Sequence, residues 1–266
     1  MEWTAFLFAG IGSVLFLSLI FATAVNRNRY DVIDIAWGLT FISIAYISYM
    51  TYVPVVAFSV QLLVILLVTV WGIRLSAHIY ARWVSSDKED ARYTAYRQTY
   101  SKKVGGLKLN MYLRIFLVQA VLAVIVALPV ITINAVPVVA LTYVSLIGLV
   151  IWAVGFYFEA IGDYQLKKFI ANPKNKGKLM TSGVWRYTRH PNYFGEITQW
   201  WGIFVIVVFA VPTYWWIAVI GPVTITLLLM FISGVPLTEK HFASKPGWEV
   251  YKKRTSKLIP LPRRRE

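Results

Sequence analysis

Cysteine is absent from the 266 residues of this chain, and histidine occurs only three times. Without thiols the chain can form no disulfide bond, thiolate metal site or cysteine nucleophile. The histidines, His78, His190 and His241, lack the paired spacing of a zinc-binding helix, so no metal site is predicted. Glycine-rich G-x-G-x-x-G and Walker-type loops are also absent, and any nucleotide must therefore bind on a different scaffold.

Charged residues are scarce as well, at 15% of the chain, where a soluble domain has nearer a quarter. Hydrophobic residues make up 58%, and seven apolar stretches approach or exceed the roughly 20 residues that cross a bilayer. The sequence therefore predicts an all-α polytopic membrane protein, a seven-helix bundle forming one membrane domain over residues 1–266. The predicted spans are Thr4–Val25, Asp31–Met50, Val55–Ile73, Met111–Val130, Val136–Phe158, Tyr193–Val211 and Thr213–Ile232.

The connections between these spans alternate in charge. Three carry none, namely Thr51–Pro54, Ile131–Ala135 and the turn at Pro212. Because basic connections mark the cytoplasmic side, the amino terminus is predicted outside and the carboxy terminus in the cytoplasm. The net charge of +15 is then mainly a topology signal with some contact to anionic membrane lipids, and no nucleic-acid partner is predicted. The basic residues lie at Arg27 and Arg29, Arg82–Lys108, Lys167–Arg189 and Lys240–Arg265.

Polar residues in or beside the spans form four sets, all at the predicted cytoplasmic end. Polar groups at one depth on different helices would lack partners in lipid, so they predict a pocket. The sets are Glu159 and Asp163 with Lys167; Asn192, Glu196 and Gln199; Arg74, His78 and Arg82; and Asp31 and Asp34, followed by Trp37.

Each set also has a structural interpretation. Pro191 is favoured in a first helical turn and Glu196 complements the helix dipole there, but this leaves His190, Asn192 and Tyr193 without a role. The remaining structural interpretations are pairing of Glu159 and Asp163 with Lys167, snorkelling of Arg74, His78 and Arg82 to headgroups, and an interfacial role for Asp31 beside Arg27 and Arg29.

Three separated motifs in the second half resemble one known family. The stretches 162–169 and 183–196, and the tail with His241, Glu249–Arg254 and Leu258–Pro260, follow the order and spacing of the steroid 5-alpha-reductases. The resemblance covers about Val154 to Leu261 and looks closest to a bacterial branch. Over the first four spans it is limited to D-x-x-D-x-x-W-G and W-G-x-R segments.

The resemblance implies a seven-helix bundle that holds NADPH in a cytosol-facing cavity and admits a lipid-like substrate from the bilayer. The implied activity is reduction of a carbon–carbon double bond conjugated to a carbonyl, in a steroid-like or other lipid. Residues 1–130 would form the substrate side and residues 136–261 the part that binds NADPH. An integral protein of a bacterial inner membrane, with its site facing the cytoplasm, is the implied location.

The family's cofactor positions transfer to this chain by motif. Asp163, Asn192, Glu196 and His241 match cofactor-binding positions, and the same motif contains further candidates. These are Tyr187, Arg189, His190 and Tyr193 in the motif, with the basic residues Lys178, Arg186 and Arg254 as partners for the phosphates.

The chain departs from the family where human-type enzymes place a glutamate and a tyrosine on the steroid ketone. Hydride addition to an enone builds negative charge on the carbonyl oxygen, so a positioned donor is still needed. Asp34 would serve if burial kept it protonated, and His78 or Tyr80 are alternatives. The hypothesis is that Asp34 and His78 face the substrate. Substrate contacts are also assigned to Trp37, Arg74 and Glu159.

A membrane methyltransferase of the isoprenylcysteine or phospholipid type is the rival interpretation. Such enzymes bind S-adenosylmethionine and carry an R-x-P-x-Y-x-G element, which Arg189, Pro191, Tyr193 and Gly195 satisfy. Asp163 followed by tyrosine, together with Asn192, fits the reductase pattern better. A non-enzymatic lipid carrier is the third alternative, and it predicts no affinity for nucleotides.

Overall fold

The structure is a computed structural model that describes residues 1–51 and 58–264. Among these residues, seven helical stretches are long and apolar enough to cross a membrane, which confirms the predicted all-α membrane class. The stretches are Trp3–Asn26, Val32–Met50, Val60–Val84, Gly106–Val126, Ser145–Ala171, Pro191–Ala210 and Pro212–Phe242.

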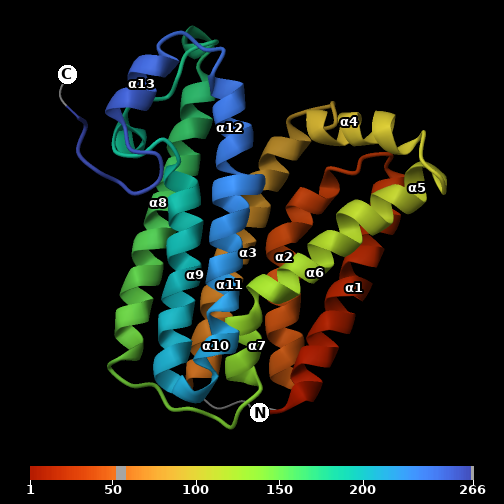
Figure 1. Ribbon diagram of the computed structural model, residues 1–266, viewed down its shortest axis with the longest axis vertical. Helices are drawn as coiled ribbons and strands as arrows, with labels where there is room; N and C mark the ends of the chain where they lie inside the picture. Colours follow the sequence, from red (N-terminus) through yellow and green to blue (C-terminus); the bar gives the residue numbers. More distant parts are fainter. Residues whose placement is uncertain (52–57, 265–266) are drawn as a thin grey trace. The chain divides into compact units, whose positions relative to one another are not determined.

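The described chain groups into two compact units (Figure 1). Unit 1 comprises Met1–Thr142 and Val207–Ile220, and unit 2 comprises Tyr143–Ile206 and Gly221–Glu266. Each unit thus contains helices from distant parts of the sequence.

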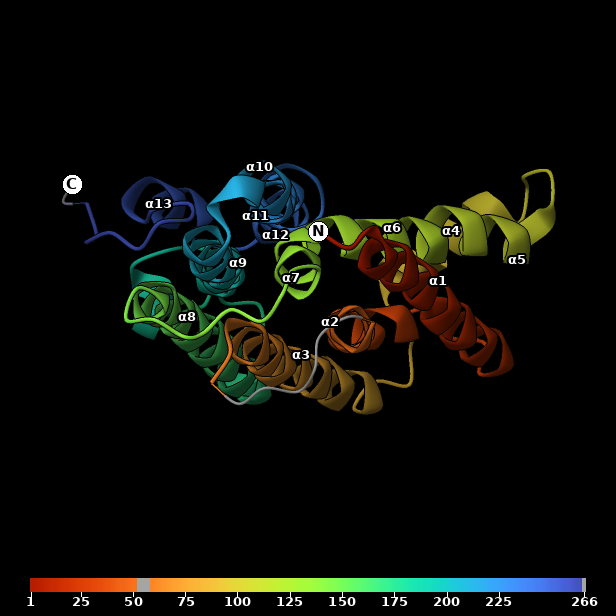
Figure 2. The same ribbon diagram turned by 90° about the horizontal axis from the view of Figure 1, so that it is seen from below.

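In unit 1 the second membrane helix, α2 (Val32–Met50), packs against both α1 (Trp3–Asn26) and α3 (Val60–Val84), as Figure 2 shows. Helices α2 and α3 cross closely at two glycines, since a Cβ built on Gly38 would clash with the backbone oxygen of Gly72. The remaining elements of this unit are α4 (Ala91–Tyr100), α5 (Gly106–Met111), η1 (Tyr112–Phe116), α6 (Leu117–Val126), α7 (Leu128–Asn134), η4 (Pro212–Tyr214) and α10 (Trp215–Ala218).

Unit 2 is organised by two long helices that lie side by side in both views, α8 (Ser145–Ala171) and α9 (Pro191–Ala210) (Figures 1 and 2). The turn between them contains η2 (Pro173–Asn175) and η3 (Gly183–Arg186). The rest of the unit is α11 (Ile220–Leu227), η5 (Leu228–Ile232), α12 (Val235–Phe242) and α13 (Trp248–Arg254).

Glycines set the distance between α8 and α9. A Cβ built on Gly155 would lie 2.6 Å from the backbone oxygen of Gly195, and one on Gly202 would lie 2.8 Å from that of Gly148. Small residues at such crossings let helix backbones approach closely within a membrane. The close approach places the polar side chains of the two helices within hydrogen-bonding distance of each other.

The predicted bounds of several spans are wrong. The fifth span begins at Ser145 rather than Val136, because Pro137 removes a backbone donor and Val60 N donates to Val139 O in an extended pairing. It continues to Ala171, beyond the predicted end at Phe158, so Glu159, Asp163 and Lys167 all lie on one helix. Polar residues ended the apolar run without ending the helix.

The third span likewise extends to Val84, beyond the predicted Ile73, and carries Arg74, His78 and Arg82 within it. It begins at Val60, where the Ser59 hydroxyl accepts a hydrogen bond from Leu62 N. The predicted start at Val55 and the connection at residues 52–54 lie outside the described residues. The predicted connection Ile131–Ala135 is wrong, because these residues continue helix α7 to Asn134.

Candidate functional site

A line of polar residues, all buried except the half-buried Asn192, follows the α8–α9 crossing of unit 2. Asn192 Nδ2 donates to Asp163 Oδ1 at 3.3 Å, and Gln199 Nε2 donates to Glu159 Oε2. Glu196 is buried on the same helix as Asn192. We call these five residues the polar seam. Four of them are predicted site residues, and the structure brings them together.

The residues that precede α9 are anchored to α8 by η3. Trp185 is buried and its Nε1 donates to the backbone oxygen of Gly162 at 3.0 Å. Val184 N donates to Gln165 Oε1 at 3.0 Å. This turn places Arg189 and His190 at the amino end of α9, next to the seam.

Arg189 is buried and forms a clasp with Glu239 of α12. Its Nη2 lies 2.7 Å and its Nε 3.0 Å from Glu239 Oε1, and its Nη1 donates to the backbone oxygens of Lys252 and Thr255. Four of the five N–H groups of Arg189 are therefore engaged by protein acceptors. This geometry assigns Arg189 to fastening α12 and α13 onto the motif, and its predicted contact with a cofactor stays a prediction.

His190 extends the same clasp. Its Nε2 lies 3.3 Å from Glu239 Oε1, and its ring stacks on Tyr193 with centroids 5.4 Å apart. Burial lowers the pKa of His190, although the neighbouring Glu239 favours the charged form. A neutral imidazole that donates from Nε2 to Glu239 leaves Nδ1 as an acceptor. Tyr193 is fixed in turn, because its hydroxyl lies 2.9 Å from Thr238 Oγ1.

Two buried acceptors along α9 have no hydrogen-bond partner within the described part of the chain. They are His190 Nδ1 and Gln199 Oε1, on side chains that are 0% and 1% exposed. An unsatisfied buried acceptor costs roughly 1–3 kcal/mol, so such atoms usually meet an ordered water or a ligand. These two atoms are therefore suited to a ligand that carries N–H or O–H donors.

The predicted phosphate partners lie at the surface of unit 2. Lys178 and Arg186 have exposed side chains, and Arg254 is half-buried. Two other predicted cofactor residues are also exposed, namely His241 and Tyr187, the latter at 44%. They are accessible to an anionic group, in contrast to the buried seam.

The predicted catalytic acid of unit 1, Asp34, is held by two partners that sequence reasoning missed. Arg92 Nη2 and the Tyr93 hydroxyl both lie 2.6 Å from its carboxylate. Burial, followed by the charge of Asp34, raises the pKa of Tyr93 well above its usual value, so this phenol keeps its proton.

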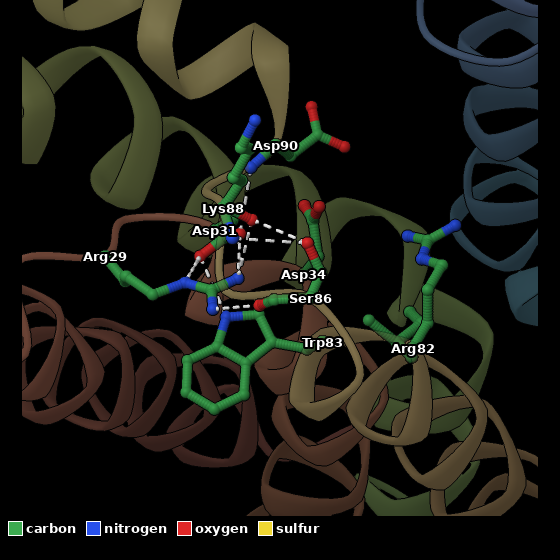
Figure 3. A pocket seen from close by; sticks show the side chains of 9 residues that line it. Arg29, Asp31, Asp34, Arg82, Trp83, Ser86, Lys88 and Asp90 are labelled. Carbon is green, nitrogen blue, oxygen red and sulfur yellow. Dashed lines mark hydrogen bonds and ion pairs between the residues drawn. The ribbon is translucent and has the colours of Figure 1, made fainter.

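Asp34 lines a polar cavity of about 190 Å³ together with Arg82 and Asp90 (Figure 3). Asp31 lines the same cavity and pairs with Arg29 at 2.8 Å, in agreement with its interpretation as an acid beside Arg29. Burial alone would raise the pKa of Asp31, but the hydrogen bonds from Arg29 and Trp83 outweigh it and lower the pKa. The acids of this cavity are therefore held by arginines.

The other predicted residues of unit 1 lie on α2 and α3. His78 and Arg74 are half-buried, and Tyr80 is 54% exposed with its ring stacked on Trp83. Trp37 packs edge-on against Phe41 at 4.9 Å. Their roles toward a substrate stay predictions.

Glu239, Arg92 and Tyr93 were the residues that sequence reasoning missed. Each lies in a segment interpreted as a charged connection or as the end of a span. The signal for Glu239 was that it is one of only three acids, with Glu249 and Glu266, in a basic carboxy-terminal region. Only the fold reveals that it meets the Arg189–His190 pair.

Comparisons with known proteins give one match over most of the chain. The family described as "Protein of unknown function (DUF1295)" matches residues 20–255. The "Probable O-methyltransferase ustE" of Ustilaginoidea virens is 46% identical over 46 residues, which are 17% of this chain and 16% of that protein. No solved structure matches.

Proposed function

The chain belongs to the DUF1295 family, and from the geometry of unit 2 we propose that it is a membrane reductase that uses NADPH. The proposed reaction reduces a carbon–carbon double bond conjugated to a carbonyl in a lipid-like substrate. The observation that carries the proposal is the polar seam together with two unsatisfied buried acceptors, Gln199 Oε1 within the seam and His190 Nδ1 just before α9.

The seam suits the nicotinamide nucleoside. Asn192 offers both an amide donor and an acceptor, which complement a carboxamide. Asp163 and Glu196 supply acceptors for ribose hydroxyls, as do the unsatisfied acceptors on His190 and Gln199. When bound, NADPH supplies the hydride, and the seam's residues orient and desolvate the ring that carries it.

The phosphates of NADPH require cations, and unit 2 provides them at its surface. Lys178 and Arg186 are exposed, and arginine in particular binds phosphate through two parallel hydrogen bonds. S-adenosylmethionine lacks phosphates and has no comparable need for these residues. Basic residues at the surface of the unit that contains the seam therefore favour a phosphorylated dinucleotide.

The proton donor is better assigned to α3 than to Asp34. Asp34 accepts hydrogen bonds from Arg92 and Tyr93, and so acts as an anchor for α4. His78 and Tyr80 keep the proposed role of stabilising the carbonyl oxygen as negative charge develops.

Equilibrium binding of NADPH, NADH and S-adenosylmethionine to the full-length protein in detergent tests the proposal. We expect NADPH to bind, and Asn192→Ala and Glu196→Ala each to weaken it about tenfold, the effect of one lost hydrogen bond to a charged or buried group. Thr198→Ala, on the same helix and half-buried, is the matched control and should bind normally. Absence of NADPH binding to the folded protein would refute the proposal.

A methyltransferase is the second candidate, because of the short match to a probable O-methyltransferase and the R-x-P-x-Y-x-G element at Arg189–Gly195. In that case S-adenosylmethionine would bind selectively, and Arg186→Gln with Lys178→Gln would leave its affinity unchanged. In the reductase the same double variant should weaken NADPH binding about tenfold or more, since two charge-assisted contacts are lost.

The proposed orientation places the amino terminus outside and the basic carboxy terminus in the cytoplasm. An inner-membrane location of a bacterial cell, with the cofactor taken from the cytoplasm, follows from that orientation and from the resemblance to bacterial reductases. Accessibility of single introduced cysteines to a membrane-impermeant reagent checks it, since the chain has no native cysteine.

A further inference from the structure

The carboxy-terminal segment of unit 2 has an inner face that is fixed to the fold. This segment, residues 248–264, is called here the carboxy-terminal block. Trp248 and Tyr251 are buried, and the Tyr251 hydroxyl donates to the backbone oxygen of Trp185 at 2.7 Å. Its backbone also bonds the motif, because Arg189 N donates to Ser256 O and Leu261 N donates to Tyr187 O.

The outer face of the block is basic and apolar at once. The block has six basic residues and one acidic residue, Glu249. Exposure alternates along the extended part: Lys257, Ile259 and Leu261 are exposed, with Ile259 at 61%, whereas the residues between them are half-buried. A period of two places the exposed side chains on one face. Val250 adds a third exposed apolar side chain, on α13.

The block is attached to α8 nearly one hydrocarbon-core thickness from the start of that helix. Tyr251 bonds the backbone of Trp185, and Trp185 Nε1 bonds Gly162 of α8. From Ser145, where α8 begins, to Gly162 the helix rises about 26 Å, close to the roughly 30 Å thickness of the hydrocarbon core. The headgroup layer therefore meets α8 at the level where the block is attached.

We propose that the outer face of the carboxy-terminal block docks onto the anionic phospholipid headgroups of the membrane in which the protein resides. Lysines beside exposed aliphatic side chains match an interfacial surface, where the charges meet lipid phosphates and the aliphatic groups enter the acyl boundary. Free phosphate would satisfy the lysines but leave Ile259 and Leu261 in water. The inference does not depend on which cofactor the seam binds.

Docking has a consequence for the candidate site, because the carboxy-terminal block contacts both the lipid headgroups and Arg189. The carbonyls of Lys252 and Thr255, which accept from Arg189, belong to the segment whose side chains face the headgroups. Anionic lipid that holds the block would thereby stabilise the Arg189–Glu239 clasp at the amino end of α9.

A single fluorescent probe tests the docking, because the chain has no native cysteine. Ile259→Cys, labelled with an environment-sensitive dye, is placed with the full-length protein in nanodiscs of zwitterionic lipid with or without about 30% anionic phosphatidylglycerol. The labelled Val104→Cys is the matched control, since Val104 is 99% exposed and also follows two lysines. Quenching is measured with spin-labelled lipids of either headgroup.

At position 259 we expect blue-shifted emission and several-fold stronger quenching by the anionic than by the zwitterionic spin-labelled lipid. Each lysine near an anionic surface contributes roughly fivefold in affinity, so Lys253→Gln with Lys257→Gln should bring the quenching ratio to about one. Unchanged thermal unfolding of that variant in zwitterionic lipid shows that it folds.

Water-like emission at 259, equal quenching by both lipids, or the same preference at position 104 would each overturn the proposal. So would loss of the preference on addition of inorganic phosphate at constant ionic strength, which would identify a phosphate site instead.

Discussion

Both units are built on a close crossing of two membrane helices at glycine, Gly38 with Gly72 in unit 1 and Gly155 with Gly195 in unit 2. In unit 1 the side chains near the crossing are largely aromatic and aliphatic, with Phe41 against Trp71 at 5.3 Å. In unit 2 an acid and an amide, Glu159 and Gln199, follow the crossing glycines by four residues.

The acids of the two units also differ in their partners. Asp31 and Asp34 of unit 1 lie at the amino end of α2, where Arg29 and Arg92 pair with them. Asp163 of unit 2 accepts from an amide, that of Asn192. A guanidinium neutralises the acid that it binds, whereas an amide supplies a hydrogen bond without a charge. The acids beside α2 are thus fastened by cations, and the contact of Asp163 with α9 is a hydrogen bond from a neutral donor.

The largest effect is expected where the crossing itself is altered. A Cβ on Gly195 would lie 2.5 Å from Glu159 N and 2.5 Å from Gly155 O, which are backbone atoms that cannot move without parting the helices. Gly195→Ala should therefore destabilise the protein by about 3 kcal/mol, measured by thermal unfolding in detergent. Gly38→Ala should behave similarly in unit 1.

Gly10→Ala is the control for both variants, because nothing lies within 4 Å of a Cβ at that position of α1. It should be neutral or stabilise by up to about 1 kcal/mol through helix propensity. A Gly195→Ala protein as stable as the wild type would show that the crossing is not tight, and the comparison of the two units would lose its common element.

Breaking the clasp should have the next largest effect. Glu239→Ala leaves the buried Arg189 guanidinium without its carboxylate, at a cost of about 2–3 kcal/mol. Glu239→Gln keeps a hydrogen-bond acceptor and should lose less. Asp90→Asn in unit 1 breaks an exposed ion pair, in which the side chain of Asp90 is 36% exposed and that of Arg92 42% exposed. This change should cost under about 1 kcal/mol. Urea or heat unfolding ranks the three, and equal losses would contradict the distinction between buried and exposed pairs.

The polar residues near the crossings offer a direct contrast. Gln199→Leu removes the amide that donates to Glu159, and should cost about 1–2 kcal/mol because a buried acceptor loses its donor. Ser76→Ala in unit 1 removes a buried hydroxyl that has no partner among the described residues, and should be neutral or slightly stabilising. Chemical unfolding of both variants measures the contrast. If Ser76→Ala cost as much as Gln199→Leu, polarity at the two crossings would have the same role.

The sequence was sufficient to predict seven spans, because uncharged apolar runs of about 20 residues are typical of helices that cross a bilayer. It failed at the ends of spans, where α8 continues through Glu159 and Asp163 to Ala171. A prediction from hydropathy ends a span at the first acidic residue. The helix itself continues, because a neighbouring helix supplies hydrogen-bond partners for the polar side chains.

The seam was predictable from helical spacing and motif, since Glu159 and Asp163 must share a face of one helix. The Glu239 clasp was not, because 49 residues separate it from His190 and no local pattern records the contact. The same holds for the hydrogen bond from Tyr93 to Asp34, which depends on how α4 folds back onto α2.

The smallest expected effect is a dependence of stability on pH that belongs to unit 2. Burial lowers the pKa of His190 in the folded state below its unfolded value near 6.5. The unfolded chain therefore binds the proton first as pH falls, and the stability that neutral His190 provides is lost progressively below about pH 6.5. The slope from one such group is at most about 1.4 kcal/mol per pH unit.

Unfolding midpoints between pH 5.5 and 8 should show this decline in the wild type and a flatter profile in His190→Asn. His241→Asn, which alters an exposed histidine of the same unit, should retain the wild-type slope. Identical profiles for the wild type and His190→Asn would place the titrating group elsewhere, and the clasp would then have no part in the response to acid.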